Sequence, residues 1–127
     1  QQAHDRHLLL TYKTPEDLRK RQEQQIQLID EEISAAMRRI LVLDQNLKEE
    51  REQAAEWQKK QDRPNARLPY AVQQRISSIA NAILAEDALI QERRNERTRL
   101  NRDFEANAAR LTELLAHLPA EQQEPAN

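Results

Sequence analysis

Apolar residues recur at a seven-residue spacing along two long stretches of this chain. In the first stretch, one row of apolar positions begins at Ile26 and a second row begins three residues later, at Ile29. In the second stretch, the corresponding rows begin at Ile76 and Ile79. This spacing places the apolar side chains on one face of an α-helix and is typical of the a and d positions of a coiled coil. The pattern predicts an all-α protein built around two long helices.

Capping signals indicate where the first long helix begins. In the sequence TPED, Thr14 can accept a hydrogen bond from the first turn, and Pro15 fits the first helical position. Asp17 lies where an acid completes a capping box. The apolar spacing continues from there, and we expect this helix over about 14–61.

Prolines divide the first helix from the second. Pro64 and Pro69 interrupt the apolar pattern, because proline lacks the amide hydrogen that a helix interior needs. We therefore expect a tip loop over 62–68 and a second helix over about 69–118. Residues 119–127 have no apolar periodicity and are expected to form a disordered tail.

A short loop between two long helices predicts an antiparallel hairpin. Folding the chain about residue 65 pairs positions whose numbers add to about 130. This register places the acidic stretch 30–32 opposite the basic stretch around Arg97, Arg99 and Arg102. It also puts Arg38 and Arg39 near Glu92. The apolar residues that we expect to form the seam, within the hairpin and in a dimer, are Ile26, Ile29, Ile33, Ile40, Leu43, Leu47, Ile76, Ile79, Ile83, Ile90, Leu100, Phe104 and Leu111. Charged residues also fall at seam positions, and we expect them to pair across the bundle or to mark where it opens: Glu86, Arg93 and Arg97.

Further apolar residues lie beside this narrow seam, at Leu18, Met37, Leu41, Val42, Leu84, Leu89 and Leu115. A stripe wider than the a and d positions indicates that a third or fourth helix covers it. We expect a homodimer in which two hairpins form a four-helix bundle. The alternative is a monomeric hairpin that leaves these leucines exposed.

The segment before the first helix is unusually apolar. Residues 1–13 include the sequence RHLLLTY, and we expect a short extended N-terminal junction here. In an extended strand, alternation would place Leu8, Leu10 and Tyr12 on one face. An upstream domain, a second copy or the helices of the same chain could cover that face. The alternative is a disordered lead-in.

The composition excludes several kinds of site. The chain has no glycine, which excludes a P-loop and a dinucleotide-binding fingerprint, and no cysteine, which excludes disulfides. Its 20 basic and 22 acidic residues give a net charge of −2, so nucleic acid is not an expected partner of the whole molecule. No apolar run approaches the roughly 20 residues of a membrane span, and we expect no membrane insertion.

The histidines and serines do not form a catalytic pattern. His4 and His7 precede the first long helix, and His117 lies near the end of the second, where its charge suits the helix dipole. Facing Glu-x-x-His pairs, which di-iron bundles need, are absent from the sequence. We therefore expect no catalytic residue, no metal ligand and no cofactor, and we do not expect an enzyme.

The tip region concentrates basic and apolar side chains, and its candidate contact residues are Lys59, Lys60, Arg63, Arg67, Leu68 and Tyr70. Such a loop could contact phosphates and stack a base, or dock an acidic protein. The simplest interpretation is a solvated turn in which Trp57, Leu68 and Tyr70 close the end of the bundle.

The segment Arg6 to Tyr12, with the charged helical stretch that follows it, resembles part of a known group of proteins. These are small uncharacterised proteobacterial periplasmic or envelope proteins, in which a signal peptide and a small β-rich domain precede a similar R-x-L-L-L-T-Y segment. The resemblance implies a periplasmic or secreted protein, and it implies no activity for any residue.

Together these patterns predict a non-enzymatic structural or protein-interaction module. Its hairpin would dimerise and could dock an unidentified protein partner in the bacterial envelope. One alternative is nucleic-acid or anion binding through the basic tip. Another is a holdase-type chaperone, in which splayed hairpins hold unfolded proteins.

Overall fold

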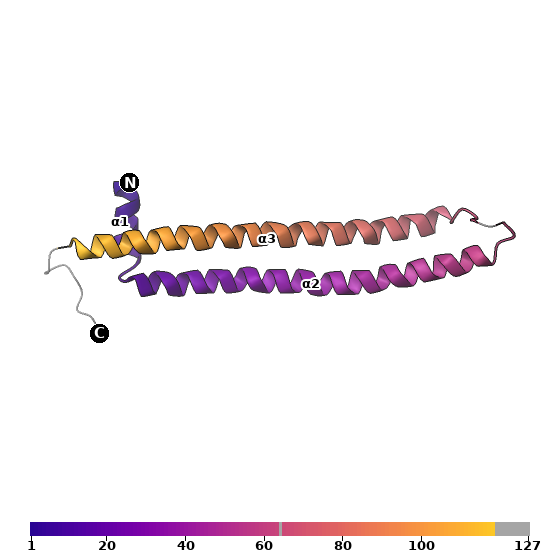
Figure 1. Cartoon of the computed structure of the whole chain (residues 1–127), viewed down its shortest axis with the longest axis horizontal. Helices are drawn as coiled ribbons and strands as arrows, with labels where there is room; N and C mark the ends of the chain where they lie inside the picture. Colours follow the sequence, from indigo (N-terminus) through magenta and orange to yellow (C-terminus); the bar gives the residue numbers. More distant parts are fainter. Residues whose placement is uncertain (64, 119–127) are drawn as a thin grey trace. The chain divides into compact units, whose positions relative to one another are not determined.

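A computed structural model describes residues 1–63 and 65–118 of the chain. The described residues form three helices and no strand: α1 (Gln2–Thr11), α2 (Pro15–Lys59) and α3 (Tyr70–Ala116) (Figure 1). The prediction of an all-α fold with two long helices is confirmed for this part of the chain. The expected tail, 119–127, lies outside the described residues, as does Pro64 in the expected tip loop.

The start of α2 follows the predicted capping pattern. The Thr14 hydroxyl accepts a hydrogen bond from the backbone N–H of Asp17 at 3.2 Å, and Pro15 is the first helical residue. Glu16 and Asp17 lie in the first turn, where negative charge favours the positive end of the helix dipole. The N-cap therefore fixes this boundary from the local sequence alone.

The N-terminal segment is a helix, so the prediction of an extended junction over 1–13 is wrong. The sequence QAHDRHLLL contains no β-branched residue, and alanine, leucine, arginine and glutamine all favour a helix. Helix α1 ends at Thr11 because Tyr12 takes an extended conformation, and Pro15 soon follows. In a helix, residues two apart point in opposite directions. Leu8 is accordingly 1% exposed and Leu10 is 80% exposed, where a strand would have placed both on one face.

The chain divides into two compact units. The terminal unit combines Gln1–Asp30 with the chain from Arg94 onward, and the hairpin unit is Glu31–Arg93. Helix α1 lies wholly in the terminal unit, whereas α2 and α3 each contribute to both units.

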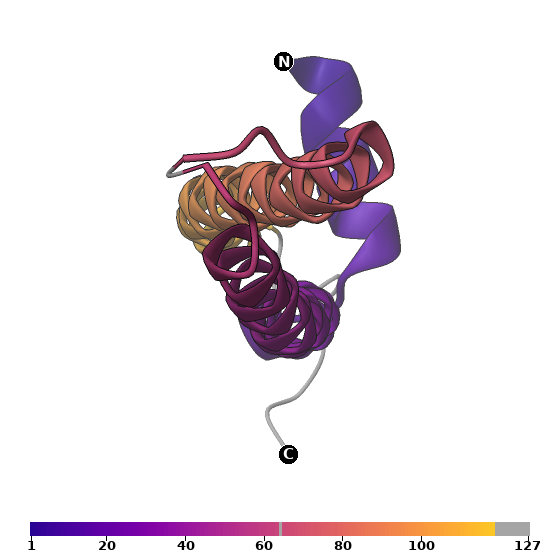
Figure 2. The ribbon, with the colours of Figure 1, turned by 90° about the vertical axis from the view of Figure 1, so that its right-hand side faces the viewer.

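The terminal unit has a core to which all three helices contribute. Leu8 from α1, Leu18 from α2, and Phe104 and Leu111 from α3 form one buried cluster. Partly buried residues that pack against this cluster include Leu9, Tyr12, Leu100, Ala108, Leu114 and Leu115. Helix α1 runs across α3 rather than along it (Figures 1 and 2). A third helix of the same chain therefore covers the off-seam residues at Leu18 and Leu115.

In the hairpin unit, α2 and α3 run antiparallel, and their buried residues are Ala36, Leu47, Ala54 and Ile90. Ion pairs between the two helices show the register: Arg39–Glu86, Glu50–Arg75 and Glu32–Arg93. The residue numbers of each pair add to 125. The predicted register, near 130, is therefore wrong by more than one helical turn.

The loop at the end of the hairpin explains this shift. The Gln58 side-chain amide donates to the Ala66 carbonyl at 2.9 Å, so the chain has already reversed direction when it reaches Ala66. Asn65 takes a left-handed conformation at φ 60°, which suits a turn. Residues 66–69 are non-helical, because Pro69 disfavours helical geometry at the residue before it. The non-helical residues 66–69 therefore lie on the α3 side of the loop, and the paired positions of α2 and α3 are centred near residue 62 rather than 65.

Candidate functional site

The predicted seam residues lie inside the chain's own helix pairs. Ile29, Leu47, Ile90, Phe104 and Leu111 are buried, and the other predicted seam residues are half-buried. None of them is exposed, although several had been expected to face a second copy as well. The large apolar side chains that remain exposed on α2 and α3 of the hairpin unit lie beside the seam.

The charged residues at seam positions all pair with acids or bases of α2. Glu86 accepts two hydrogen bonds from Arg39, and Arg93 pairs with Glu32, within the hairpin unit. Arg97 pairs with Asp30 at 3.2 Å within the terminal unit. The expectation that the basic stretch faces residues 30–32 is confirmed at Arg97. The expected proximity of Arg39 to Glu92 is wrong, because Arg39 pairs with Glu86 in the observed register.

Large apolar side chains remain exposed on one flank of the hairpin unit. Met37, Leu41 and Leu84 are between 50% and 70% exposed, and we call them the flank patch. Met37 and Leu41 are four residues apart and so share one face of α2. The register that pairs Arg39 with Glu86 sets Leu84 level with Leu41. The flank patch therefore draws on both helices.

The opposite flank of the same unit carries a shallow recess of about 630 Å³. It is lined by Ala35, Arg38, Arg39, Val42, Leu43, Ala82 and Glu86. Ala82 and Leu84 are two residues apart on α3, which turns them about 200° from one another. Since Val42 and Ala82 line this recess, Leu84 faces away from it. The two flanks are thus distinct surfaces.

The Arg39–Glu86 pair closes one side of this recess. Arg39 Nε donates to Oε1 of Glu86 and Nη2 donates to Oε2, both at 2.9 Å. These hydrogen bonds lower the pKa of the Glu86 carboxyl and raise the pKa of the Arg39 guanidinium. The pair therefore stays charged and joins α2 to α3 at this level.

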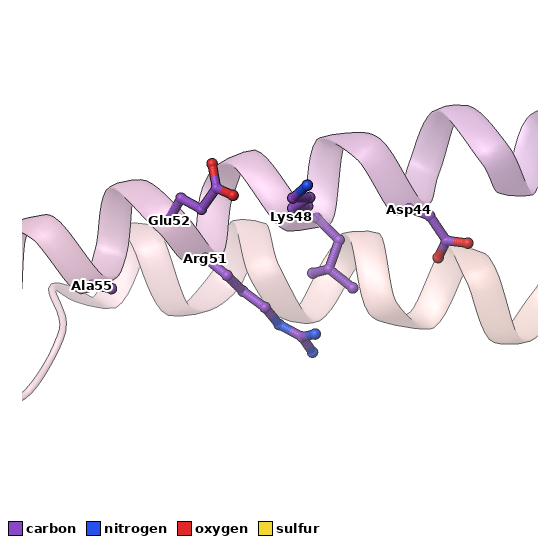
Figure 3. Close-up of a pocket in the computed structure, with 6 residues that line it drawn as sticks. Asp44, Lys48, Arg51, Glu52 and Ala55 are labelled. Atoms are coloured by element: carbon purple, nitrogen blue, oxygen red, sulfur yellow. The ribbon is translucent and has the colours of Figure 1, made fainter.

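A second recess, of about 490 Å³, continues the flank patch along α2. Its lining residues are Asp44, Leu47, Lys48, Arg51, Glu52 and Ala55 (Figure 3). Leu41, Lys48 and Ala55 are spaced by seven residues and so share one helix face. Asp44 and Arg51 extend toward α3, whereas Glu52 points away from it (Figure 3). This part of the flank carries two acids and two bases, so it has no net charge.

The predicted tip residues differ in their exposure to solvent. Lys59, Lys60, Arg63 and Arg67 are exposed, and Tyr70 is 75% exposed. Leu68 instead lines a small recess with Trp57 and Val72, which closes the end of the hairpin unit as expected. The expectation that Tyr70 also closes this end is wrong, because Tyr70 is the first residue of α3 and remains exposed.

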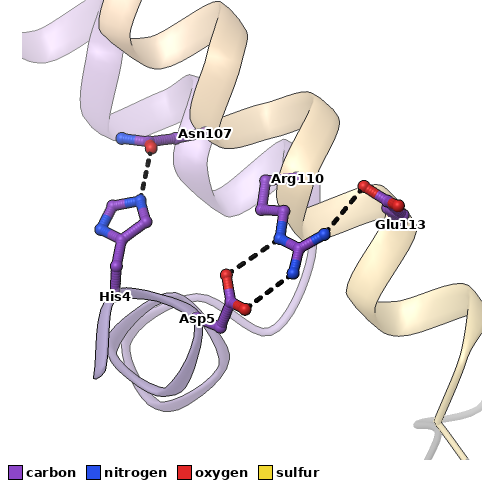
Figure 4. Close-up of polar contacts among 5 residues, drawn as sticks. All are labelled: His4, Asp5, Asn107, Arg110 and Glu113. Atoms are coloured by element: carbon purple, nitrogen blue, oxygen red, sulfur yellow. Dashed lines mark hydrogen bonds and ion pairs between the residues drawn. The ribbon is translucent and has the colours of Figure 1, made fainter. Parts of the chain in front are cut away.

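Polar contacts that the sequence does not indicate hold α1 in the terminal unit. Arg110 donates from Nε to Oδ1 of Asp5 at 2.9 Å and from Nη2 to Oδ2 at 2.7 Å (Figure 4). Arg110 also donates to Glu113, and His4 Nε2 lies 2.9 Å from Oδ1 of Asn107. The hydrogen bonds from Arg110 lower the pKa of Asp5 and raise that of Arg110. No local signal points to Asp5, because its partner lies 105 residues away.

Among the described residues, no group of three or more histidine, cysteine or acidic side chains could hold a metal ion. His4 contacts Asn107, and His7 Nδ1 lies 3.4 Å from the Thr11 hydroxyl. No helix in the described ranges is long and apolar enough to cross a membrane.

Comparison with known proteins adds no family to this description. No protein-family model, curated protein or solved structure matches the chain. The chain is thus defined by its fold as a helical-hairpin protein with an additional N-terminal helix.

Proposed function

We propose that this protein is a non-enzymatic interaction module whose hairpin unit dimerises through the flank patch. The observation that carries the proposal is the exposure of Met37, Leu41 and Leu84 on one flank of two packed helices. Pairing two such flanks places four helices around a shared apolar centre, which gives the four-helix bundle predicted from the sequence.

The size of this flank suits a modest interface. The face from Met37 to Ala55 covers 19 residues, or about 27 Å of helix, and two adjacent helices are about 20 Å wide. The flank therefore offers on the order of 500 Å² per partner, and the resulting dimer lies at the lower end of specific interfaces. Burying each large apolar side chain contributes up to about 1.5–3 kcal/mol, against an association cost of about 4 kcal/mol or more. We accordingly expect a dimer in the micromolar range.

The charges beside the patch allow a second copy to approach. A two-fold interface brings each residue of the patch toward the same patch on the partner. Asp44, Lys48, Arg51 and Glu52 carry opposite charges in equal number, so a second copy meets acids as well as bases. Electrostatic complementarity of this kind favours correct encounter more than it adds affinity.

The resemblance of the segment from Arg6 to Tyr12 to envelope proteins supports a place in the bacterial envelope, as a periplasmic or secreted protein. In that setting the hairpin unit would dimerise, and the dimer could dock a further protein. Helix α1 contains most of the segment that resembles these envelope proteins. In those proteins, the β-rich domain comes before this segment.

Sedimentation velocity tests the dimer. We expect the wild-type chain to be dimeric at tens of micromolar, and a variant with Met37→Gln, Leu41→Gln and Leu84→Gln to be monomeric with unchanged helix content. The matched control replaces three exposed apolar residues outside the flank patch, through Leu10→Gln, Leu28→Gln and Val42→Gln. The control should remain dimeric. A wild-type monomer at these concentrations would refute the proposal, and a monomeric control with a dimeric patch variant would place the interface elsewhere.

A further inference from the structure

The end of the hairpin unit carries a concentration of positive charge. The tip cations are Lys59, Lys60, Arg63 and Arg67. Between Lys59 and Tyr70 the only acid is Asp62, so this segment has a net charge of +3, whereas the whole chain has a net charge of −2. The tip is therefore a basic region on a molecule that is otherwise acidic.

These cations take no part in holding the helices together. Elsewhere in the hairpin unit, Arg39, Arg75 and Arg93 each pair with an acid of the facing helix. In the described part of the chain, the tip cations make no such ion pair, and all four are exposed. Their charge is thus available to a ligand from outside the chain.

The surroundings of the tip cations restrict the kind of ligand. The recess at this end is lined by residues such as Trp57, Leu68 and Val72, and it includes none of the four tip cations. The four tip cations are exposed and lie outside this recess. Single-stranded nucleic acid is held in a basic groove that follows its backbone, and the recess at the tip is not such a groove. A group of exposed, long and flexible cations instead suits a broad anionic surface, which it can contact without a fixed register.

Tyr70 adds an aromatic group to this cluster. It begins α3 and is 75% exposed, although its neighbour Leu68 is turned into the recess. Tyrosine prefers the interface between lipid and water, where its ring reaches the headgroup region and its hydroxyl stays hydrated. The combination of lysine, arginine and exposed tyrosine therefore favours a lipid surface over an acidic protein.

We propose that the tip of the hairpin unit binds the phosphate headgroups of an anionic lipid surface. The tip cations contact the phosphates, and Tyr70 lies at the headgroup level. Each lysine or arginine near an anionic surface strengthens binding by about fivefold. The attraction is screened by salt, because the Debye length falls from about 30 Å at 0.01 M to about 8 Å at 0.15 M.

Vesicle flotation with the full chain tests this proposal. The probes are vesicles of phosphatidylcholine alone and vesicles of phosphatidylcholine and phosphatidylglycerol in equal parts. The tip variant carries Lys59→Gln, Lys60→Gln, Arg63→Gln and Arg67→Gln. The control variant carries Lys20→Gln, Arg21→Gln, Arg99→Gln and Arg102→Gln, which are exposed cations of the terminal unit. Both variants lose four charges, so they have the same net charge.

We expect the wild-type chain to bind the anionic vesicles at low salt and not the neutral ones. The tip variant should bind at least tenfold more weakly, and the control variant should bind within about threefold of wild type, since it keeps the tip cations. Tyr70→Ser should also weaken binding. No binding to anionic vesicles, or equal losses in both variants, would overturn the proposal. Binding of a single-stranded oligonucleotide at the same salt without vesicle binding would overturn it in favour of nucleic acid.

Discussion

Arg110 of α3 holds Asp5 of α1 through two parallel hydrogen bonds, at 2.9 and 2.7 Å, across 105 residues of sequence. The Asp5 side chain is only 15% exposed in this pair. The same carboxylate lies one turn before Leu8, whose side chain is part of the buried cluster. The ion pair therefore orients α1 so that Leu8 enters the core of the terminal unit.

This pair should make the docking of α1 depend on pH. The pKa of Asp5 is lowered in the folded state, mainly by the hydrogen bonds from Arg110. The folded state therefore binds fewer protons than the unfolded state at acidic pH, and the stabilisation is complete above the ordinary carboxyl pKa. It is lost as the pH falls through the lowered pKa. The protection factors of the α1 amides, which correct for the intrinsic pH dependence of hydrogen exchange, should fall over that acidic range.

The variant Asp5→Asn tests whether the Asp5 carboxylate is the group that makes the docking of α1 depend on pH. It should show fast α1 exchange at neutral pH, because the charge that Arg110 holds has been removed, and its pH dependence should be flatter than that of wild type. Glu105→Gln is the control, since Glu105 is an exposed acid on α3 in the same unit. An unchanged loss of α1 protection at acidic pH in Asp5→Asn would show that another carboxylate controls α1.

Two leucines of α1 should differ sharply in their contribution to stability. Leu8 is 1% exposed and packs with Leu18, Phe104 and Leu111, so Leu8→Ala should cost about 2–5 kcal/mol or the whole docking free energy of α1, whichever is smaller. Leu10 is 80% exposed, and Leu10→Ala should change stability by less than about 0.5 kcal/mol. Urea unfolding and α1 hydrogen exchange measure both effects. Equal losses in the two variants would contradict the helical placement of this segment.

The contrast between Leu8 and Leu10 shows that the sequence alone did not determine the conformation of the N-terminal segment. A run of three leucines followed by Thr11 and Tyr12 fits a short strand by alternation and a short helix by propensity. Only the core beneath it distinguishes the two, because a helix directs Leu8 alone into the cluster. That cluster includes Phe104 and Leu111, which are distant in the sequence and were predicted as seam residues only.

The two long helices were predictable, since their seven-residue spacing and the Thr14 cap are local signals. The register of the hairpin was not predictable, because it depends on how many loop residues lie on each side of the turn. Pro69 keeps the segment before α3 non-helical, and the reversal occurs before Ala66. The flank patch was visible as a wider stripe at Met37 and Leu41. Its separation from Val42 depends on the observed pairing of α2 with α3.

The register of the hairpin unit can be tested by exchanging charges. Arg39→Glu should lower the thermal midpoint, because it places a second carboxylate beside Glu86. Combining it with Glu86→Arg should recover most of the loss, since the pair is then restored with reversed polarity. Combining Arg39→Glu with Glu92→Arg should recover little, because Glu92 lies more than a turn away from this position. Rescue by Glu92→Arg instead would support the register in which residue numbers add to about 130.

The N-cap of α2 offers a final test, because Thr14 has a hydroxyl with a defined structural role. Its hydroxyl oxygen accepts a hydrogen bond from the backbone N–H of Asp17, a first-turn amide that also donates to the Thr14 carbonyl at 3.1 Å. Thr14→Ala should therefore lower the free energy of unfolding by about 1 kcal/mol. Thr98→Ala is the matched control, since the Thr98 hydroxyl donates to the Arg94 carbonyl within α3. Alanine favours a helix interior over threonine, so the control should be neutral or slightly stabilising. Equal effects of the two substitutions in urea unfolding would show that the cap does not determine where α2 begins.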